Sequence, residues 1–206
     1  MTMWTRLLVV GVVMAVSLQT QAVQIGAGSG IPAGILDSAG SRLNIDNTVF
    51  PNLPAATYDV VDFEYSASAN PGNLQPFLAA LTGANQYTVL WVGPTASSPG
   101  AGINTVPYAP GTEQFTLGAA TDVYAGFNAS SNTVFFGAGL TDHNNPALFG
   151  ITPGSVIGPF TNNNLGRSYA FEINVARAQN IIPEPATASL GLLALSGLAM
   201  RRRRTT

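Results

Sequence analysis

The sequence predicts an all-β protein whose strands form an antiparallel β-sandwich with a jelly-roll-like arrangement. Three observations support this prediction: short segments of alternating apolar residues, many turn formers with 22 Gly and 14 Pro, and a charged fraction of 9% without any Lys. An average soluble protein has about 25% charged residues, and long helices rely on Glu and Lys. Many short strands joined by turns fit this composition better.

Strand segments are recognised by apolar residues at every second position, which places one face of a strand in a core. The clearest alternation covers Ser168–Val175, whereas Tyr87–Val92 is apolar at most positions, as expected of a strand buried on both sides. Leu74–Leu81 indicates a short helix, although Pro76 counts against it. Further strands are expected at Val61–Tyr65, Gln114–Leu117, Val123–Phe127 and Thr133–Phe136.

Turn-forming residues mark the loops. Gly93–Pro110 contains four Pro and three Gly and is expected to be a loop, and Asp142–Pro146 is expected to be a polar turn. Residues 23–56 are rich in Gly and Pro, and the pattern fits either an ordered edge region or a loose arm.

Charge and cysteine content exclude several classes of function. The net charge is −2, but residues 23–180 contain nine acidic residues and only three Arg, so the body of the chain is acidic. Such a surface repels phosphate backbones, and we therefore expect no nucleic-acid partner. The chain has no Cys, which leaves no disulfide, no thiolate metal site and no cysteine nucleophile.

The first 22 residues are typical of a secretory signal peptide. Arg6 precedes the apolar run Leu7–Val16, and small residues, Thr20 and Ala22, stand at the third and first positions before a cleavage after Ala22. The alternative is an uncleaved membrane anchor, but this run is far shorter than the roughly 20 residues that span a bilayer. We therefore expect export by the Sec machinery and cleavage after Ala22.

Residues 181–206 divide into three parts: the triplet Pro183-Glu184-Pro185, an uncharged apolar stretch over 186–200, and Arg201–Arg204. The prolines hold the backbone extended around Glu184, as the cleft of a processing enzyme requires. As a helix the apolar stretch is about 22 Å long, and the arginine stems extend it to about 28 Å, close to the thickness of the hydrocarbon layer. The arginines would remain cytoplasmic. The pattern predicts a short, transiently held transmembrane helix.

This tail resembles the PEP-CTERM sorting signal of Gram-negative bacteria that make exopolysaccharide. The resemblance implies that exosortase, a membrane transpeptidase-like protein, recognises Pro183, Glu184 and Pro185 and that the tail is removed near them. It also implies passage through the inner membrane and a final location at the cell surface or in the extracellular matrix. The alternative is an ordinary C-terminal anchor with a chance triplet.

The expected organisation is a signal peptide at 1–22, a β-sandwich passenger domain at 23–180, and a sorting signal at 181–206. The sorting signal comprises the triplet, the helix and a membrane-topology anchor made of Arg201, Arg202, Arg203 and Arg204. The passenger also resembles domains found ahead of PEP-CTERM tails, most of them uncharacterised. The similar stretches are residues 75–79 leading into 87–93, 123–127, 142–144 and 166–171.

The single histidine, His143, lies in a stretch of Asp and Asn residues. Oxygen ligands from Asp142 and Asn144 could bind a hard cation such as calcium, or the loop could bind a glycan. The same residue types also form ordinary polar turns, and we favour the turn. One His without Cys cannot supply a zinc site. We therefore expect no metal and no cofactor, with calcium left as the open alternative.

No catalytic constellation is found. Asp59, Asp62 and Glu64 are close in sequence, as a glycosidase carboxylate pair would be, but the last two share the solvent-facing side of the expected strand. Trp91, Tyr108 and Tyr124 could stack on sugars, although Trp91 fits a core position better. No Gly-x-Ser-x-Gly elbow, P-loop or dinucleotide fingerprint occurs.

The sequence therefore favours a non-enzymatic surface or matrix protein associated with exopolysaccharide. The alternative is a carbohydrate-binding module that uses calcium or an aromatic platform, and a glycan-active enzyme is disfavoured.

Overall fold

The computed structural model describes residues 21–30, 35–36, 40–44, 50–68, 72–97, 100–131, 134–138, 142–145, 150–159, 162–164 and 167–178. Within these ranges the chain forms seventeen strands and no helix. Every pairing between these strands is antiparallel. For this part of the chain the all-β prediction is confirmed. The signal peptide up to residue 20 and the sorting helix at 186–200 lie outside the described residues.

The first of the two large sheets, here called sheet I, is built around the twelve-residue strand β5 (Ala56–Ala67). One edge of β5 pairs with β17 (Phe171–Arg177), which in turn pairs with β1 (Val23–Ile25). The other edge of β5 pairs with β10 (Gln114–Leu117) at one end and with β9 (Gly102–Pro107) at the other. Sheet I thus joins the first described strand to the last described one.

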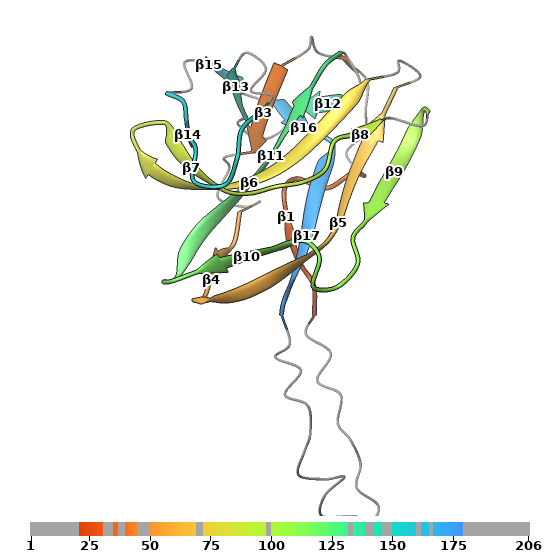
Figure 1. Ribbon diagram of the computed structural model, residues 1–206. Helices are drawn as coiled ribbons and strands as arrows, with labels where there is room; N and C mark the ends of the chain where they lie inside the picture. The colour runs from red at the N-terminus through yellow and green to blue at the C-terminus, as the bar shows by residue number, and fades with distance from the viewer. Residues whose placement is uncertain are drawn as a thin grey trace, which may run out of the picture.

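Sheet II lies over sheet I (Figure 1) and is larger. Its strand order is β14 (Val156–Ile157), β7 (Gln86–Val92), β6 (Asn73–Gly83), β11 (Thr121–Ala129), β3 (Gly40–Asn44), β13 (Asp142–Asn145) and β15 (Asn162–Asn164). Two short strands pair at its margins, β4 (Asn52–Leu53) with β11 and β8 (Ala96–Ser97) with β6. A third, small sheet has the order β16 (Arg167–Tyr169), β12 (Phe135–Ala138) and β2 (Ile35–Leu36).

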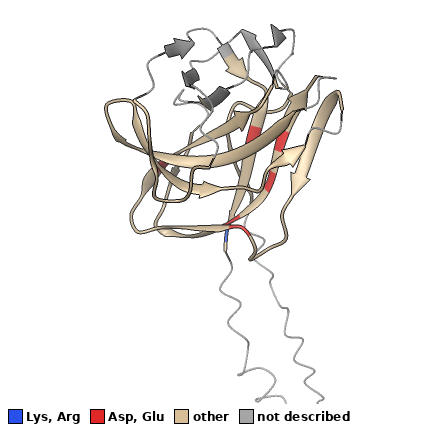
Figure 2. Cartoon of the chain, turned by 45° about the horizontal axis from the view of Figure 1, so that its top comes forward, with Lys and Arg blue, Asp and Glu red and all other residues tan. Residues whose placement is uncertain are grey.

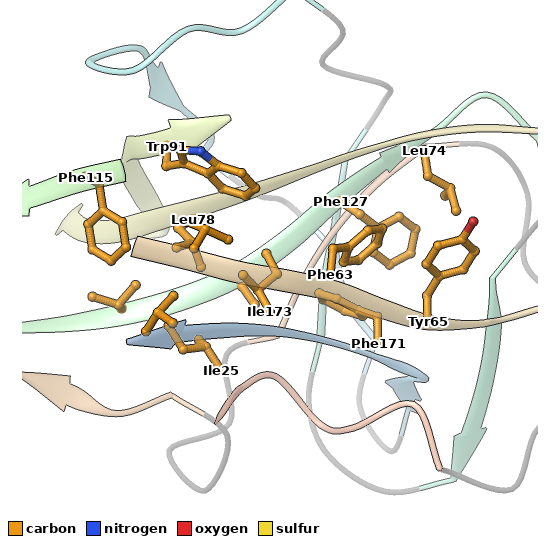
Figure 3. Packing of buried hydrophobic residues seen from close by; sticks show 14 of the residues in the cluster. Ile25, Phe63, Tyr65, Leu74, Leu78, Trp91, Phe115, Phe127, Phe171 and Ile173 are labelled. Atoms are coloured by element: carbon orange, nitrogen blue, oxygen red, sulfur yellow. The ribbon is translucent and has the colours of Figure 1, made fainter. Parts of the chain in front are cut away.

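The main hydrophobic core lies between sheets I and II and contains side chains from both. Figure 3 shows Phe127 of β11 close to Phe63 and Phe171 of sheet I. The ring centroids of Phe127 and Phe171 are 4.8 Å apart at 79°, the edge-to-face geometry that aromatic quadrupoles favour. Burial of such large apolar side chains is the dominant stabilising term for a domain of this size. The described strands therefore form a sandwich-like pair of antiparallel sheets.

A second cluster covers the opposite face of sheet II and includes Leu43, Phe77, Tyr87 and Tyr124. Strand β7 contacts both clusters because its register against β6 skips Leu90. This bulge turns Trp91 and the partly buried Leu90 toward the main core, whereas Tyr87 lies in the second cluster. The prediction that Tyr87–Val92 is buried on both sides holds only in part, since Tyr87, Val89 and Trp91 are buried but the residues between and after them are half-buried.

The short helix predicted at Leu74–Leu81 is wrong, since these residues belong to β6. The apolar run is long because β6 lies between β7 and β11 and has a hydrophobic cluster on each face. Pro76 is tolerated there although it has no N–H to donate, and its carbonyl accepts a bond from Gly93 N–H at 2.8 Å.

Two other predicted strands and one predicted loop need correction. The run Ser168–Val175 is divided at Ala170, so its first residues pair in the small sheet and the rest in sheet I. The predicted loop Gly93–Pro110 contains two strands, β8 and β9, because partner strands satisfy its backbone groups. Of the predicted Thr133–Phe136 strand, Thr133 lies outside the described residues, Val134 forms an isolated bridge to Ala67, and Phe135 begins β12. In contrast, Gln114–Leu117 and Val123–Phe127 are strands as predicted.

Candidate functional site

The two ends of the folded body lie side by side at one end of sheet I (Figure 1). Val23, the first residue of β1, is directly opposite Val175 of β17. Strand β17 ends at Arg177, and Ala178 N–H donates to the carbonyl of Thr57 at 2.9 Å. At this end of sheet I, β1 and β17 pair with each other, and the predicted leader and the predicted tail would both be attached there.

Of the residues predicted to direct processing, only Ala22 is described by the structure. It is exposed and immediately precedes β1. The recognition residues Pro183, Glu184 and Pro185 and the basic run Arg201–Arg204 lie outside the described residues. Over the residues that are described, no helix has the length and apolar character needed to cross a membrane.

A polar network covers the outer face of sheet I, where Glu64 of β5 and Glu172 of β17 occupy directly opposite positions. Figure 2 shows acidic positions on neighbouring strands. Like charges in such a pair are destabilising, but Ser29 bridges them: its hydroxyl donates to Glu64 and its N–H donates to Glu172 Oε2 at 3.4 Å. Thr105 on β9 donates a further bond to Glu64 Oε2 at 3.0 Å. Neutral donors from two segments, the one that contains Ser29 and β9, thus hold the two carboxylates.

Asn174 extends this network to a third carboxylate. Its amide nitrogen donates to Asp62 Oδ1 at 2.8 Å and to Glu172 Oε1 at 2.9 Å. Asp62 lies on the same face as Glu64 because it is two residues away in an extended strand, whereas the β5–β17 register shifts between Asn174 and Val175 and leaves Val61 out of the alternation. Val60, not Val61, is therefore the buried neighbour of Phe63, which corrects the predicted Val61–Tyr65 pattern.

Asp59 and Glu113 have structural partners instead of belonging to this network. Asp59 Oδ1 accepts bonds from Gly111 N–H at 2.9 Å and from Gln114 Nε2 at 2.7 Å, and so fixes the β9–β10 loop. Glu113 Oε2 accepts the indole N–H of Trp91 at 2.8 Å, which links that loop to sheet II. These carboxylates therefore tie loops and sheets together.

The three aromatic residues considered as a sugar platform are packed into the protein. Trp91 and Tyr124 are 3% and 5% exposed, too little to offer a stacking face. Tyr124 packs against Phe50 with ring centroids 4.2 Å apart, and Tyr108 packs edge-on against Trp91 at 5.6 Å. The core position expected for Trp91 is confirmed.

The Tyr108 hydroxyl is buried, and no hydrogen-bond partner is seen for it in the described part of the chain. Burial raises the pKa of Tyr108 above its ordinary value of 10, and the nearby carboxylates Glu113 and Asp62 raise this pKa further. Burial likewise raises the pKa values of Tyr87 and Tyr124. All three phenols are therefore neutral at physiological pH.

We expect the free energy of unfolding to fall as pH rises above about 10, because the unfolded chain then releases protons that the folded chain keeps. In Tyr108→Phe the slope of the unfolding free energy against pH should be smaller by the equivalent of up to about one proton. Stability near pH 7 should change little, since the lost hydroxyl has no described partner. Urea unfolding at a series of pH values between 8 and 11 measures the slope. An unchanged slope would show that Tyr108 ionises normally in the folded protein.

Asp142, His143 and Asn144 lie in strand β13 and not in the predicted polar turn. They pair with β3 on one side, where Asp142 is opposite Asn44, and with β15 on the other, where it is opposite Asn164. Two neighbouring backbone ladders stabilise strand here although Asp and Asn have low strand propensity. Among the described residues no group of three or more His, Asp or Glu is arranged to hold a metal ion. The calcium hypothesis for Asp142 and Asn144 stays a prediction, now placed on a strand.

Sequence reasoning missed Ser29, Glu172 and Glu113 as site residues. Ser29 is 5% exposed but lies in a Gly-rich stretch whose composition suggests only a loop. Ser29 lies 35 residues from Glu64, and Glu172 lies 143 residues from Ser29. The one available signal in the sequence was the polar position of Glu172 in its alternating strand. This position predicts that Glu172 lies on the outer face, but it does not predict which residues bind it.

No protein-family model, no curated protein and no solved structure matches this chain. The residues and geometry described above are therefore the basis of any functional assignment.

Proposed function

We propose that this chain is an exported, non-enzymatic protein of the cell surface or extracellular matrix of a Gram-negative bacterium. Its leader is removed after Ala22, and an exosortase recognises its tail through Pro183, Glu184 and Pro185. The mature product is the acidic all-β body, with the finer jelly-roll-like arrangement that its sequence predicts, associated with exopolysaccharide.

The observation that carries this proposal is the match between the ends of the folded body and the two predicted processing points. Strand β1 begins at Val23, directly after Ala22, and β17 ends at Arg177, six positions before Pro183. Removal of both ends would leave every described strand in place, as expected of a passenger that is released intact. The hydrogen-bonded carboxylates on sheet I support a structural role, since neutral donors hold all three in fixed positions.

Glu184→Ala tests the proposal, because Glu184 is the sole charged residue between Arg177 and Arg201. Losing a charge from a recognition motif costs several kcal/mol when it pairs with the enzyme. We expect at least a tenfold decrease in the processed form, which corresponds to a loss of about 1.4 kcal/mol or more in recognition free energy. The unprocessed chain should then collect in the membrane fraction.

Cell fractionation with antibody detection in an exosortase-containing host measures both effects. Thr187→Ala is the matched control, since it alters a small polar residue of the tail outside the triplet. Normal processing and localisation of Glu184→Ala would overturn the sorting proposal.

A further inference from the structure

Strand β9 lies at one margin of sheet I, where β5 is its only partner among the described strands (Figure 1). It is six residues long, whereas the other described strands with a single partner have two to four. Natural proteins protect such edges by shortness, charge, proline or a bulge. β9 has no charged residue, its register against β5 is unbroken, and its one proline, Pro107, is its last residue. This edge therefore offers a template for another strand.

One hydrogen bond identifies which backbone groups of β9 face outward. Tyr108 N–H donates to the carbonyl of Val61 at 2.8 Å. Backbone groups two residues apart lie on the same side of an antiparallel strand, so the even-numbered residues of β9 also bond toward β5. The N–H and C=O groups of Ile103 and Thr105 therefore point away from β5. Both residues are exposed, Ile103 at 61%.

Side-chain bonds hold β9 in this conformation. The Asn104 amide donates to the carbonyls of Gly100 at 3.1 Å and Gly102 at 2.9 Å, which fixes the start of the strand. The Thr105 hydroxyl donates to Glu64 Oε2 at 3.0 Å and ties its centre to β5. A strand that is already ordered loses little conformational entropy when it pairs. The edge is thus preorganised for strand addition.

Charge favours a second copy of this chain as the added strand. The body is acidic, and like charges placed against each other cost several kcal/mol. Residues 65–112 include no charged residue, so β9 is an edge where two acidic copies can meet through neutral strands. The carboxylates of β5 opposite β9, Asp62 and Glu64, already accept bonds from Asn174 and Thr105. A basic partner would instead be attracted to that acidic outer face.

We propose that β9 pairs antiparallel with β9 of a second copy, around a two-fold axis at Asn104. In this register Ile103 exchanges both of its backbone bonds with Thr105 of the partner subunit, and symmetry repeats the exchange. An axis at Thr105 would instead set Ile103 opposite Pro107, which has no N–H to donate. The two Ile103 side chains become diagonal neighbours on the outer face. The contact is small, so the dimer is reversible.

Ile103→Lys tests the pairing, because it brings two ammonium groups together across the interface. Sedimentation velocity of the full-length chain in detergent, over a series of concentrations, measures the dissociation constant. We expect a reversible wild-type dimer and association at least about tenfold weaker in Ile103→Lys. Val156→Lys is the matched control, since Val156 is 62% exposed and belongs to β14. A monomeric wild type, or a dimer on which both substitutions act equally, would overturn the pairing.

Disulfide crosslinking tests the register. The chain has no Cys, so Ile103→Cys and Thr105→Cys each introduce a single thiol. The proposed register places these two positions opposite each other at about 5.5 Å between Cα atoms, which a disulfide spans. Two copies of the same variant place their thiols diagonally, at about 7–8 Å between Cα atoms, beyond that span.

We therefore expect oxidation to crosslink a mixture of the two variants, with one of them tagged to identify the heterodimer, far more than either variant alone. Equal crosslinking of a single variant would overturn the register. Absence of crosslinking in the mixture would overturn the strand pairing itself.

Discussion

Replacing Phe171 by alanine is expected to lower the free energy of unfolding by about 3–5 kcal/mol, the range found for buried aromatic truncations. Phe171 is fully buried. Its ring contacts Phe127 of sheet II at 4.8 Å and Phe63 of its own sheet at 6.3 Å. The substitution therefore opens a cavity where the two sheets meet, and the rigid backbones of paired strands limit its collapse.

Urea unfolding followed by far-ultraviolet circular dichroism measures this loss. Val156→Ala is the control, because Val156 is 62% exposed and its truncation should change stability by less than about 0.5 kcal/mol. A loss below about 1 kcal/mol for Phe171→Ala would mean that the sheets do not share this core.

Gly93→Ala should destabilise the protein by about 1–3 kcal/mol through overpacking. A Cβ at this position would lie 2.5 Å from the Trp91 ring and 2.8 Å from Pro76 Cγ. Pro76 is fixed within β6, so the indole has to move, which strains its bond to Glu113. The effect therefore reaches the link between sheet II and the β9–β10 loop.

Fluorescence reports this movement selectively, because the chain has two tryptophans and the other, Trp4, belongs to the predicted leader. In leaderless protein we expect the Trp91 emission to shift to longer wavelength as the ring meets water. Gly118→Ala is the matched control, since a Cβ there meets nothing within 4 Å. An unshifted spectrum with unchanged stability would contradict the packing around Gly93.

The sequence was sufficient for the strands whose pattern is local. Gln114–Leu117 and Val123–Phe127 alternate regularly, and both are strands. The errors arise where a neighbouring strand determines whether a segment is helix or strand, or which of its residues face the core. Leu74–Leu81 is apolar at most positions, which periodicity alone cannot assign to helix or strand. The register shift that leaves out Val61 depends on how β17 aligns with β5, and that alignment has no signature within β5 itself.

Among the functional residues, too, some features follow from local residue types and others depend on contacts between distant segments. Cleavage after Ala22 stays a prediction from local residue types, and the structure places Ala22 directly before β1. The Ser29–Glu64–Glu172 bridge could not be predicted, because it needs the register of two strands and the path of a Gly-rich segment. Trp91 was placed correctly in the core, but its bond to Glu113 depends on how a loop of sheet I folds against β7.

The pairing of Val23 with Val175 also determines how long β1 stays unpaired during synthesis. Its partner strand leaves the ribosome only after about 150 further residues, which at 5–20 residues per second takes roughly 8–30 s. Contacts between such distant residues also form late in folding, because closing a long loop costs entropy. The topology of sheet I therefore leaves β1 without its partner strand for seconds during synthesis.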